Sequence, residues 1–244
     1  GDDGAASGGG GAGAGGTGGS GGEAPTCPVG AHELPDGSCE ATLGAFSDTS
    51  KLVEARDHHV TFAAETPNGK YLFVAGGAVD MTTIRDSFER AKINEDGTLG
   101  PWEMLPNKHR MGGPMVAQAG SLVAIMGGRT ASIQRTVKAY RVGDDASLEE
   151  VPAGGDLNDP RFHGAAVVAR GRVFAVGGLD ASVSSLDTVE SAPIAESGIG
   201  AFTREAVTLP ARLSHHGVAV HEDALYVTCG LTRTNNDSAN DVGT

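Results

Sequence analysis

Histidines beside basic residues are the side chains of this sequence whose types and spacing could do chemistry. They occur in four short turns, each followed by an apolar segment: Arg56-Asp57-His58-His59, Lys108-His109-Arg110, Arg161-Phe162-His163 and Arg212-Leu213-Ser214-His215-His216. Imidazole is a common metal ligand, so a metal site is one interpretation. A side chain that recurs in every repeat is explained more simply by hydrogen bonds that satisfy turn backbone. We therefore expect a structural role for His59, His109, His163 and His216, and no metal site.

Charged residues in four loops are the candidates for binding. The loops span residues 78–86, 129–136, 179–187 and 231–241, and they differ in sequence while the segments before them match. Loops on a rigid scaffold are frequent binding sites. A solvated rim without a ligand is the alternative. The candidate binding residues are Arg85, Arg129, Asp180 and Arg233, together with His58 and His215, one from each doubled histidine pair.

Familiar catalytic motifs do not occur in the sequence. It has no Gly-x-Ser-x-Gly elbow, phosphate-binding loop, dinucleotide fingerprint or His-Glu-x-x-His pair. The acidic pairs at 144–145 and 149–150 fit a solvated face better than a glycosidase dyad. We therefore predict no catalytic residues and no cofactor.

A repeat of about 50 residues must position these turns and loops. An apolar segment that ends in a double glycine occurs at 71–77, 122–128 and 172–178, and again at 225–230, and the second glycines lie 51, 50 and 52 residues apart. Glycine allows a positive φ and close approach of neighbouring chain. Cys229 replaces the first glycine of the fourth pair. The glycines to which we assign this structural role are Gly76, Gly77, Gly127, Gly128, Gly177, Gly178 and Gly230.

Each period contains four strand candidates. Residues 87–93 and 188–194 mix β-formers with polar residues, and an outer strand with an aromatic residue is expected at 99–102, 199–202 and 43–46. Four short strands without helical periodicity are typical of a propeller blade. We therefore predict an all-β, incomplete propeller of four-stranded antiparallel blades. Its repeats are approximately 55–106, 107–159, 160–210 and a truncated 211–244, and residues 43–53 are expected to supply an outer strand to the last blade.

The pattern of hydrophobic strand, double glycine and Arg- or His-bearing turn resembles the Kelch family over residues 43–244. This resemblance implies a Kelch-like β-propeller and says little about function. Trp102 is the only tryptophan, so the repeats look divergent, as in bacterial members. Bacterial Kelch propellers that resemble this chain include a sialic acid mutarotase. A carbohydrate-active enzyme of that type is therefore the alternative to a non-catalytic binding module.

The first 41 residues differ from the repeats. Residues 1–25 are mainly Gly, Ala, Ser and Thr, a composition typical of a flexible tether. It resembles the spacer after the lipid-carrying cysteine of bacterial lipoproteins, which implies export to the cell envelope and a lipid anchor upstream. Cys27 and Cys39 bracket a short turn-rich segment, 26–41, and we expect a disulfide between them. Unrelated thiols are the alternative. Cys229 lies in an apolar run and is expected to be buried.

Charge and hydropathy limit the partners. Eighteen Lys and Arg against 31 Asp and Glu give a net charge of −13, which argues against nucleic acid. No apolar run reaches the roughly 18 residues of a transmembrane helix. The sequence therefore predicts a non-catalytic binding or interaction module at the bacterial cell envelope, with a protein or a glycan as its partner.

Overall fold

The computed structural model describes residues 27, 31–41, 48–80, 82–222, 224–234 and 240–241. The chain forms two compact units, residues 1–47 and 48–244, which we describe separately. The predicted tether at 1–25 lies outside the described residues, as does the predicted strand segment at 43–47. Within the described ranges all regular structure is β, and no helix there is long and apolar enough to cross a membrane.

The described residues of the first unit form one small hairpin. Strands β1 (Ala31–Glu33) and β2 (Cys39–Ala41) pair antiparallel, and Leu34 N donates to Ser38 O at 2.7 Å across the turn. A disulfide joins Cys27 to Cys39, with the two Cα atoms 5.5 Å apart. The predicted disulfide is confirmed. The disulfide joins Cys27 to the first residue of β2, at the turn end of the hairpin.

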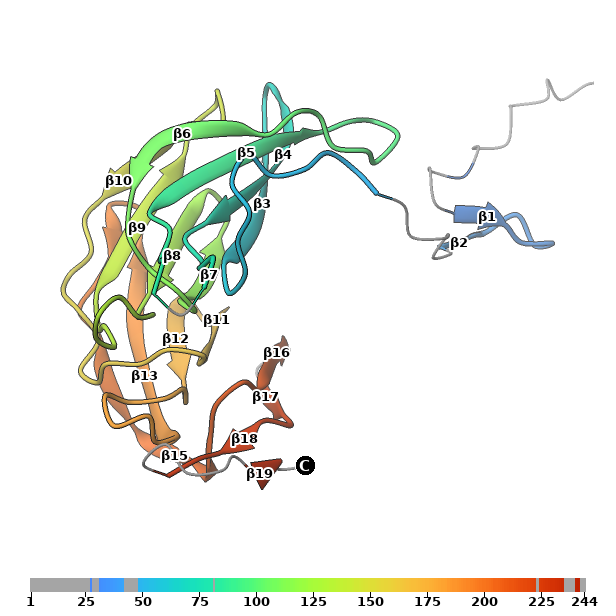
Figure 1. The fold of residues 1–244 in the computed structure, drawn as a ribbon. Coiled ribbons are helices and arrows are strands. Elements are labelled where there is room, and N and C mark those ends of the chain that lie inside the picture. Colours follow the sequence, from blue (N-terminus) through green and yellow to red (C-terminus); the bar gives the residue numbers. More distant parts are fainter. Residues whose placement is uncertain are drawn as a thin grey trace, which may run out of the picture. The chain divides into compact units, whose positions relative to one another are not determined.

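The second unit contains three sheets of four main strands each, joined in sequence order (Figure 1). We call them blades 1, 2 and 3. Blade 1 consists of β3 (Val60–Thr66), β4 (Gly69–Ala75), β5 (Ser87–Ile93) and β6 (Glu103–Lys108). Blade 2 consists of β7 (Met115–Ala119), β8 (Leu122–Met126), β9 (Val137–Val142) and β10 (Leu148–Val151). Blade 3 consists of β11 (Ala165–Ala169), β12 (Arg172–Val176), β13 (Leu186–Ala195) and β15 (Thr203–Leu213), with β14 (Gly198–Ile199) against the end of β13.

The fourth repeat, blade 4, is smaller in the described residues. Strands β16 (Gly217–His221) and β17 (Ala224–Thr228) form a hairpin, and β18 (Leu231–Thr232) pairs with β19 (Asn240–Asp241). The first strands of successive blades contact one another, β3 with β7, β7 with β11 and β11 with β16. The predicted all-β, incomplete propeller of antiparallel four-stranded sheets is confirmed.

The outer strands begin later than the sequence suggested. They start at Glu103 and Thr203, each directly after the aromatic residue expected inside them. The Trp102 indole Nε1 instead donates to Ser50 O at 3.1 Å, and Ser50 Oγ donates to Gly100 O at 2.6 Å. Residues 48–53 contain no strand. The predicted outer strand at 43–53 is therefore wrong for its described part, because this segment crosses the end of blade 1 and bonds to its turn.

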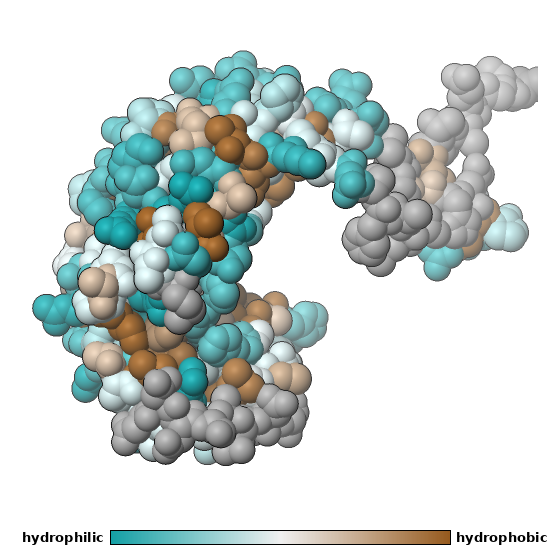
Figure 2. Space-filling view, viewed as in Figure 1, coloured by the Kyte–Doolittle hydropathy of each residue, from teal (hydrophilic) through white to brown (hydrophobic). Residues whose placement is uncertain are grey.

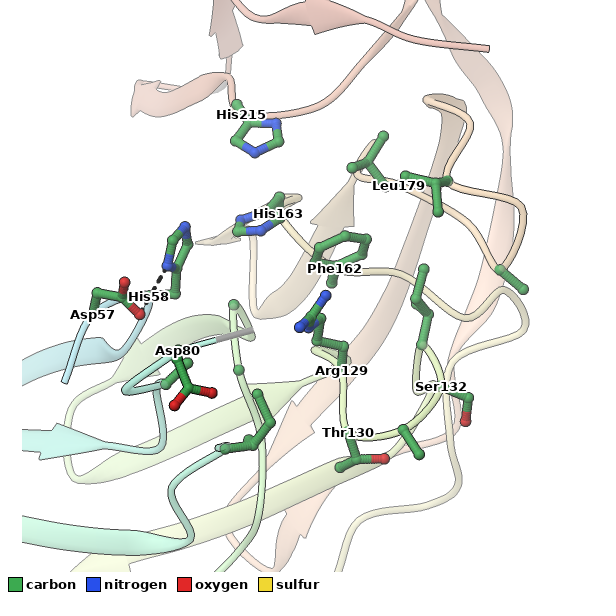
Figure 3. A pocket seen from close by; sticks show the side chains of 18 of the residues that line it. Asp57, His58, Asp80, Arg129, Thr130, Ser132, Phe162, His163, Leu179 and His215 are labelled. Carbon is green, nitrogen blue, oxygen red and sulfur yellow. Dashed lines mark ion pairs between the residues drawn. The ribbon is translucent and has the colours of Figure 1, made fainter. Parts of the chain in front are cut away.

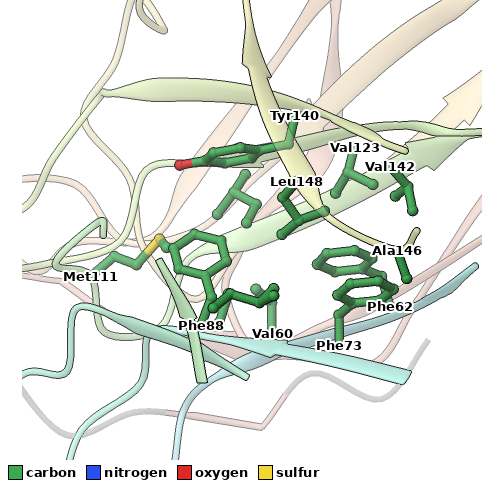
Figure 4. Packing of buried hydrophobic residues seen from close by; sticks show 13 residues of the cluster. Val60, Phe62, Phe73, Phe88, Met111, Val123, Tyr140, Val142, Ala146 and Leu148 are labelled. Carbon is green, nitrogen blue, oxygen red and sulfur yellow. The ribbon is translucent and has the colours of Figure 1, made fainter. Parts of the chain in front are cut away.

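Hydrophobic side chains fill the spaces between neighbouring sheets. Between blades 1 and 2, the rings of Phe62 and Phe73 stack with centroids 4.9 Å apart, and Phe88 meets Tyr140 edge-on at 5.3 Å (Figure 4). A second cluster joins blades 2 and 3. All five residues of β8 are buried because blade 2 has a sheet on each side. The face of the unit seen in Figure 2 is mostly hydrophilic.

The first glycine of each doublet lies where the next blade comes closest. Gly76, Gly127 and Gly177 have φ of 64°, 65° and 54°. A Cβ atom on them would lie 2.5, 2.2 and 2.6 Å from carbonyl oxygens of the following blade. A side chain there would collide with backbone, which has little freedom to move. These three positions therefore set how closely successive blades pack.

Cys229 occupies the same position in the fourth repeat, with φ of 55°. Its side chain is exposed, so the expectation of a buried thiol is wrong. The turn of a following blade covers the other three positions, whereas no described residue forms such a turn over Cys229. Its exposure is a consequence of that difference.

Candidate functional site

A cavity of about 750 Å³ lies where the turns and loops of all four repeats meet (Figure 3). The turns before the first strands contribute Asp57, His58, Gly113, Phe162, His163 and His215. The loops after the double glycines contribute the charged side chains of Asp80, Arg129 and Arg233. No two repeats contribute the same set of side chains, so the wall of the cavity differs from blade to blade.

Backbone pairing fixes which turn residues are equivalent. The bridges Asp57 to Ala78, Gly112 to Arg129, Phe162 to Leu179 and Ser214 to Leu231 mark one position in each repeat. The next residues, His58, Gly113, His163 and His215, all have a left-handed backbone, with φ of 47°, 60°, 52° and 54°. We call this the turn position.

The turn position corrects the alignment made from sequence. His163 is the counterpart of His58 and His215, not of His59 and His216 as the spacing suggested. His109 lies before the second turn, and its backbone N donates to Asp86 O at 2.8 Å. The sequence placed His163 one residue off because it aligned histidine with histidine, whereas the strand pairing aligns backbone conformation.

Backbone hydrogen bonds connect the turn positions of successive blades. Gly113 N donates to His58 O at 2.8 Å, His163 N to Gly113 O at 3.1 Å, and His215 N to His163 O at 2.8 Å. These blade-to-blade bonds use amides and carbonyls rather than imidazole nitrogens. The Nδ1 atoms of His59 and His109 are buried and have no hydrogen-bond partner in the described part of the chain.

Three imidazole rings form a row along one side of the cavity, which we call the imidazole row: His58, His163 and His215. The ring of His163 stacks on that of His215 with centroids 4.3 Å apart, and it meets His58 edge-on at 5.0 Å. Phe162 also packs against His163, at 4.4 Å. At the end of the row, His58 Nδ1 lies 3.0 Å from Asp57 Oδ1.

Burial keeps the centre of the row uncharged at neutral pH. It lowers the pKa of His163 to about 3, and the positive charges of His215, His58 and Arg129 act in the same direction. Burial, with the charges of His58 and Arg233, also lowers the pKa of His215. The centre of the row is therefore an uncharged aromatic ring rather than a cation.

The carboxylate of Asp80 is engaged by its own loop. Its Oδ1 accepts hydrogen bonds from Thr82 N at 2.8 Å, Thr82 Oγ1 at 2.7 Å and Thr83 N at 2.7 Å. These bonds hold the pKa of Asp80 well below its usual range. Asp80 therefore contributes negative charge to the cavity wall but has few lone pairs left for a ligand.

Four of the six predicted binding residues line the cavity: Arg129, Arg233, His58 and His215. Arg85 and Asp180 do not. Arg85 Nη1 forms an ion pair with Glu54 Oε1 at 3.2 Å, and Asp180 Oδ1 accepts from Ser182 N at 2.8 Å and Ser184 N at 3.0 Å. Both side chains hold local structure instead.

The sequence reasoning missed Asp57, Asp80 and Phe162, and it placed His163 among the structural residues. The signal that identifies Asp57 and Phe162 is their position directly after Arg56 and Arg161. No comparable pattern marks Asp80, because its counterpart in blade 3 is Ala181.

The described residues contain no group of three or more His, Cys, Asp or Glu side chains able to hold a metal ion. The three imidazoles of the row contact one another by their faces and edges, which does not direct three nitrogens at one point. Stacking and charge, rather than coordination, are what this arrangement offers a ligand.

No protein-family model matches the chain, and no curated protein matches it. The assignment to an incomplete all-β propeller therefore rests on its own sheets, and the function has to be inferred from the chemistry of the cavity.

Proposed function

We propose that this chain is a Kelch-type propeller module, exported to the bacterial cell envelope, that binds part of a protein or a glycan in the cavity without catalysing a reaction. The repeated double glycine followed by a turn supports the Kelch assignment. The Cys27–Cys39 disulfide is compatible with an oxidising compartment.

The observation that carries the proposal is the meeting of four non-identical loops and turns at one cavity of about 750 Å³. This volume falls in the range typical of small-ligand sites. The exposed rings of His58 and His215 can pack against an apolar ring face, as sugars and aromatic side chains both present. Arg129 and Arg233 supply hydrogen-bond donors that orient polar groups.

The serine–histidine contact at the site does not provide an accessible nucleophile. His215 Nδ1 lies 3.1 Å from Ser214 Oγ. However, Ser214 is only 1% exposed. A nucleophile has to reach its substrate, so this hydroxyl is badly placed to act as one.

A mutarotase acting on an acidic sugar is the second candidate. It is favoured by the presence of Arg129, Arg233, Asp57 and Asp80 in one cavity. Interconversion of sugar anomers requires proton transfer, and the His58 imidazole next to the Asp57 carboxylate is the pair able to provide it.

The test is a binding screen of the full chain against arrays of glycans and peptides, followed by NMR titration of each hit. Arg129→Ala and Arg233→Ala should each weaken binding about tenfold, the effect of losing a charge-assisted hydrogen bond. Arg212→Ala is the matched control, because Arg212 is exposed and outside the cavity. Binding that the cavity variants leave unchanged contradicts the proposal.

The two candidates are separated by NMR exchange spectroscopy on sialic acid anomers. Faster exchange in the presence of the chain, lost in His58→Asn, would replace the binding proposal with the mutarotase. Exchange at the uncatalysed rate excludes the mutarotase and leaves the binding proposal standing.

A further inference from the structure

Val183 has a backbone conformation that a β-branched residue rarely adopts. Its φ is 60°, in the left-handed region, where a branched side chain crowds the backbone. Of the eight described non-glycine residues with positive φ, four line the cavity, and Val183 is the β-branched one among them. Strained backbone of this kind is concentrated at functional sites, so an observed outlier is a reason to look for function.

The turn that contains Val183 is held by its own hydrogen bonds. Asp180 Oδ1 accepts from Ser182 N at 2.8 Å and from Ser184 N at 3.0 Å. On the backbone, Val183 N donates to Asp180 O, and Asp180 N donates to Ser184 O, both at 2.9 Å. These four bonds close the turn, and none of them involves the valine side chain. The turn therefore imposes the left-handed conformation on Val183.

Valine at this position does nothing for the turn itself. Glycine is free of left-handed strain, and asparagine tolerates it better than a branched side chain does. The Val183 side chain is only half-buried, so it gains less from burial than a valine of the core does. What valine adds here is an aliphatic surface in the wall of the cavity.

The loops of blades 2 and 3 supply further apolar side chains to the same cavity. Ile133 and Val183 are half-buried, whereas Phe162 and Leu179 are buried. Figure 3 shows Phe162 and Leu179 on the side of the cavity that lies away from the carboxylates of blade 1. We call these four side chains the apolar wall: Ile133, Phe162, Leu179 and Val183.

The charged side chains of the cavity balance one another in number. Asp57 and Asp80 are acidic, and Arg129 and Arg233 are basic. Both arginines take part in interactions within the protein, and Asp80 accepts hydrogen bonds from its own loop. These four groups therefore give no excess of either sign that would attract a ligand with a net charge, and a neutral ligand is favoured.

A peptide with an aliphatic side chain combines the groups that suit this cavity. Its main-chain amides are neutral and both donate and accept hydrogen bonds, so they need no net charge of either sign around them. Its side chain supplies apolar area to cover the wall. A sugar ring has hydroxyl groups around its rim and no aliphatic branch, so it would leave Ile133 and Val183 in contact with water.

We propose that the apolar wall is a subsite for an aliphatic side chain of a peptide or protein segment, and that Val183 determines its preference. This inference rests on the proposed binding function and names the ligand class. Because the hydrogen-bonded turn fixes the place of the valine, the subsite is formed before the ligand arrives, which lowers the entropy cost of binding.

The experiment is a methyl NMR titration of the full chain with capped tripeptides that have glycine at both ends and leucine, serine, aspartate or lysine in the middle. We expect the leucine peptide to bind about tenfold more tightly than the serine peptide, the effect of burying most of an aliphatic side chain. The two charged peptides should bind no more tightly than the serine peptide. The methyl signals of Ile133 and Val183 should shift. Octyl glucoside, a sugar with an alkyl chain, is titrated as the alternative ligand class.

Variants at Val183 separate the subsite from the backbone strain. Val183→Asn relieves strain and removes apolar surface, so its urea midpoint should equal or exceed the parent's while the leucine preference falls to about twofold or less. Val183→Ala shortens the side chain without adding a polar atom and should lower the preference too, so the test does not depend on one variant. Glu222→Asn is the matched control, because Glu222 has φ of 51°, is exposed and lies outside the cavity. It should relieve strain and leave the leucine preference unchanged.

The outcomes separate the two proposals. Equal binding of the leucine and serine peptides, tighter binding of a charged peptide, or a leucine preference that both Val183 variants keep overturns this inference and leaves the binding function intact. Binding of octyl glucoside without binding of the leucine peptide overturns the ligand class. A blank in every titration overturns this inference alone when the array screen yields a ligand of the cavity, and it overturns both proposals when the screen is blank as well.

Discussion

Blades 1 and 3 hold their turns with a buried ion pair, whereas blade 2 does without one. Arg56 and Arg161 occupy the position before the bridged turn residue, and Met111 occupies it in blade 2. Arg161 Nη1 donates to Gly177 O at 2.9 Å and Thr188 O at 3.1 Å. Arg56 Nη1 makes the matching bonds to Gly76 O at 2.8 Å and Ser87 O at 3.0 Å.

The carboxylate partners follow the same division. Glu89 in β5 pairs with Arg56, and Glu190 in β13 pairs with Arg161; all four side chains are fully buried. Lys138 stands at that position in β9, where it pairs with Glu150 of β10. Blade 2, which lacks the arginine, therefore lacks the glutamate too, and Met111 and Lys138 stand in their places.

The ion pair is therefore one of two ways to fill the same space in a blade. Glu190 also accepts hydrogen bonds from Asn158 N at 2.6 Å and Asp159 N at 2.9 Å, and so fixes the chain that enters blade 3. A buried pair adds little net stability over apolar packing, but removal of one member leaves an uncompensated charge.

Arg161→Met should have the largest effect. It installs the blade 2 residue but leaves Glu190 buried without its cation, so we expect a loss of about 3–5 kcal/mol in unfolding free energy. Urea denaturation followed by circular dichroism measures it. Arg161→Met combined with Glu190→Gln should lose less than the single variant, because the buried charge is gone. If the unfolding free energy of the single variant lies within about 1 kcal/mol of the parent's, the buried ion pair does not have the role assigned to it.

Gly127→Ala tests the junction between blades 2 and 3. The new Cβ would lie 2.2 Å from Arg161 O, which cannot move without disturbing the same ion pair. We expect a loss of about 2–4 kcal/mol, from overpacking together with left-handed strain. Gly120→Ala is the matched control, since Gly120 has φ of 57° and a Cβ atom on it would have no neighbour within 4 Å. That variant should lose only about 1 kcal/mol. Equal losses would contradict the close-approach argument.

Acidification should destabilise the second unit, because its fold holds buried histidines in their neutral form. The pKa of folded His163 is about 3, below its ordinary value of 6.5, so the folded state binds fewer protons than the unfolded chain. The stability that it contributes is complete above about pH 6.5 and is lost as pH falls toward 3, by at most about 1.4 kcal/mol per pH unit. His59 and His216, whose pKa values burial also lowers, act in the same direction.

Thermal unfolding between pH 7.5 and 4.5 measures this loss. His163→Gly, which gives blade 3 the turn residue of blade 2, should make the profile less steep. His221→Ala, at an exposed histidine outside the cavity, should leave it unchanged. A parent profile that stays level across this window would show that the histidines are not held in their neutral form by the fold.

Cys229→Gly should have the smallest effect. It removes a side chain from a left-handed position at the cost of a more flexible unfolded chain, for a net gain of about 0.5 kcal/mol. Cys229→Ala keeps the strain and should gain nothing. Unfolding midpoints in urea compare the two, and equal stability of both variants would contradict the argument from backbone strain.

Much of the fold was legible in the sequence because its causes are local and repeated. The double glycines mark the ends of β4, β8 and β12, and the strand expected at 87–93 is β5 with the same bounds. The short spacing of Cys27 and Cys39 predicted their disulfide correctly. The candidate site was legible only in part, since the sequence supplied Arg129, Arg233, His58 and His215 but also offered Arg85 and Asp180.

The period, the strands and the residue types at each turn follow from local causes, since hydrophobic alternation and glycine placement act within a few residues. The tertiary structure alone decided which turn residues are equivalent, and therefore that His163 belongs with His58 and His215. It also decided that Asp80 faces the cavity, that Asp180 bonds to its own loop, and that Cys229 is exposed. These outcomes depend on bonds across strands and between blades, whose partners lie tens of residues apart and leave no fixed spacing in the chain.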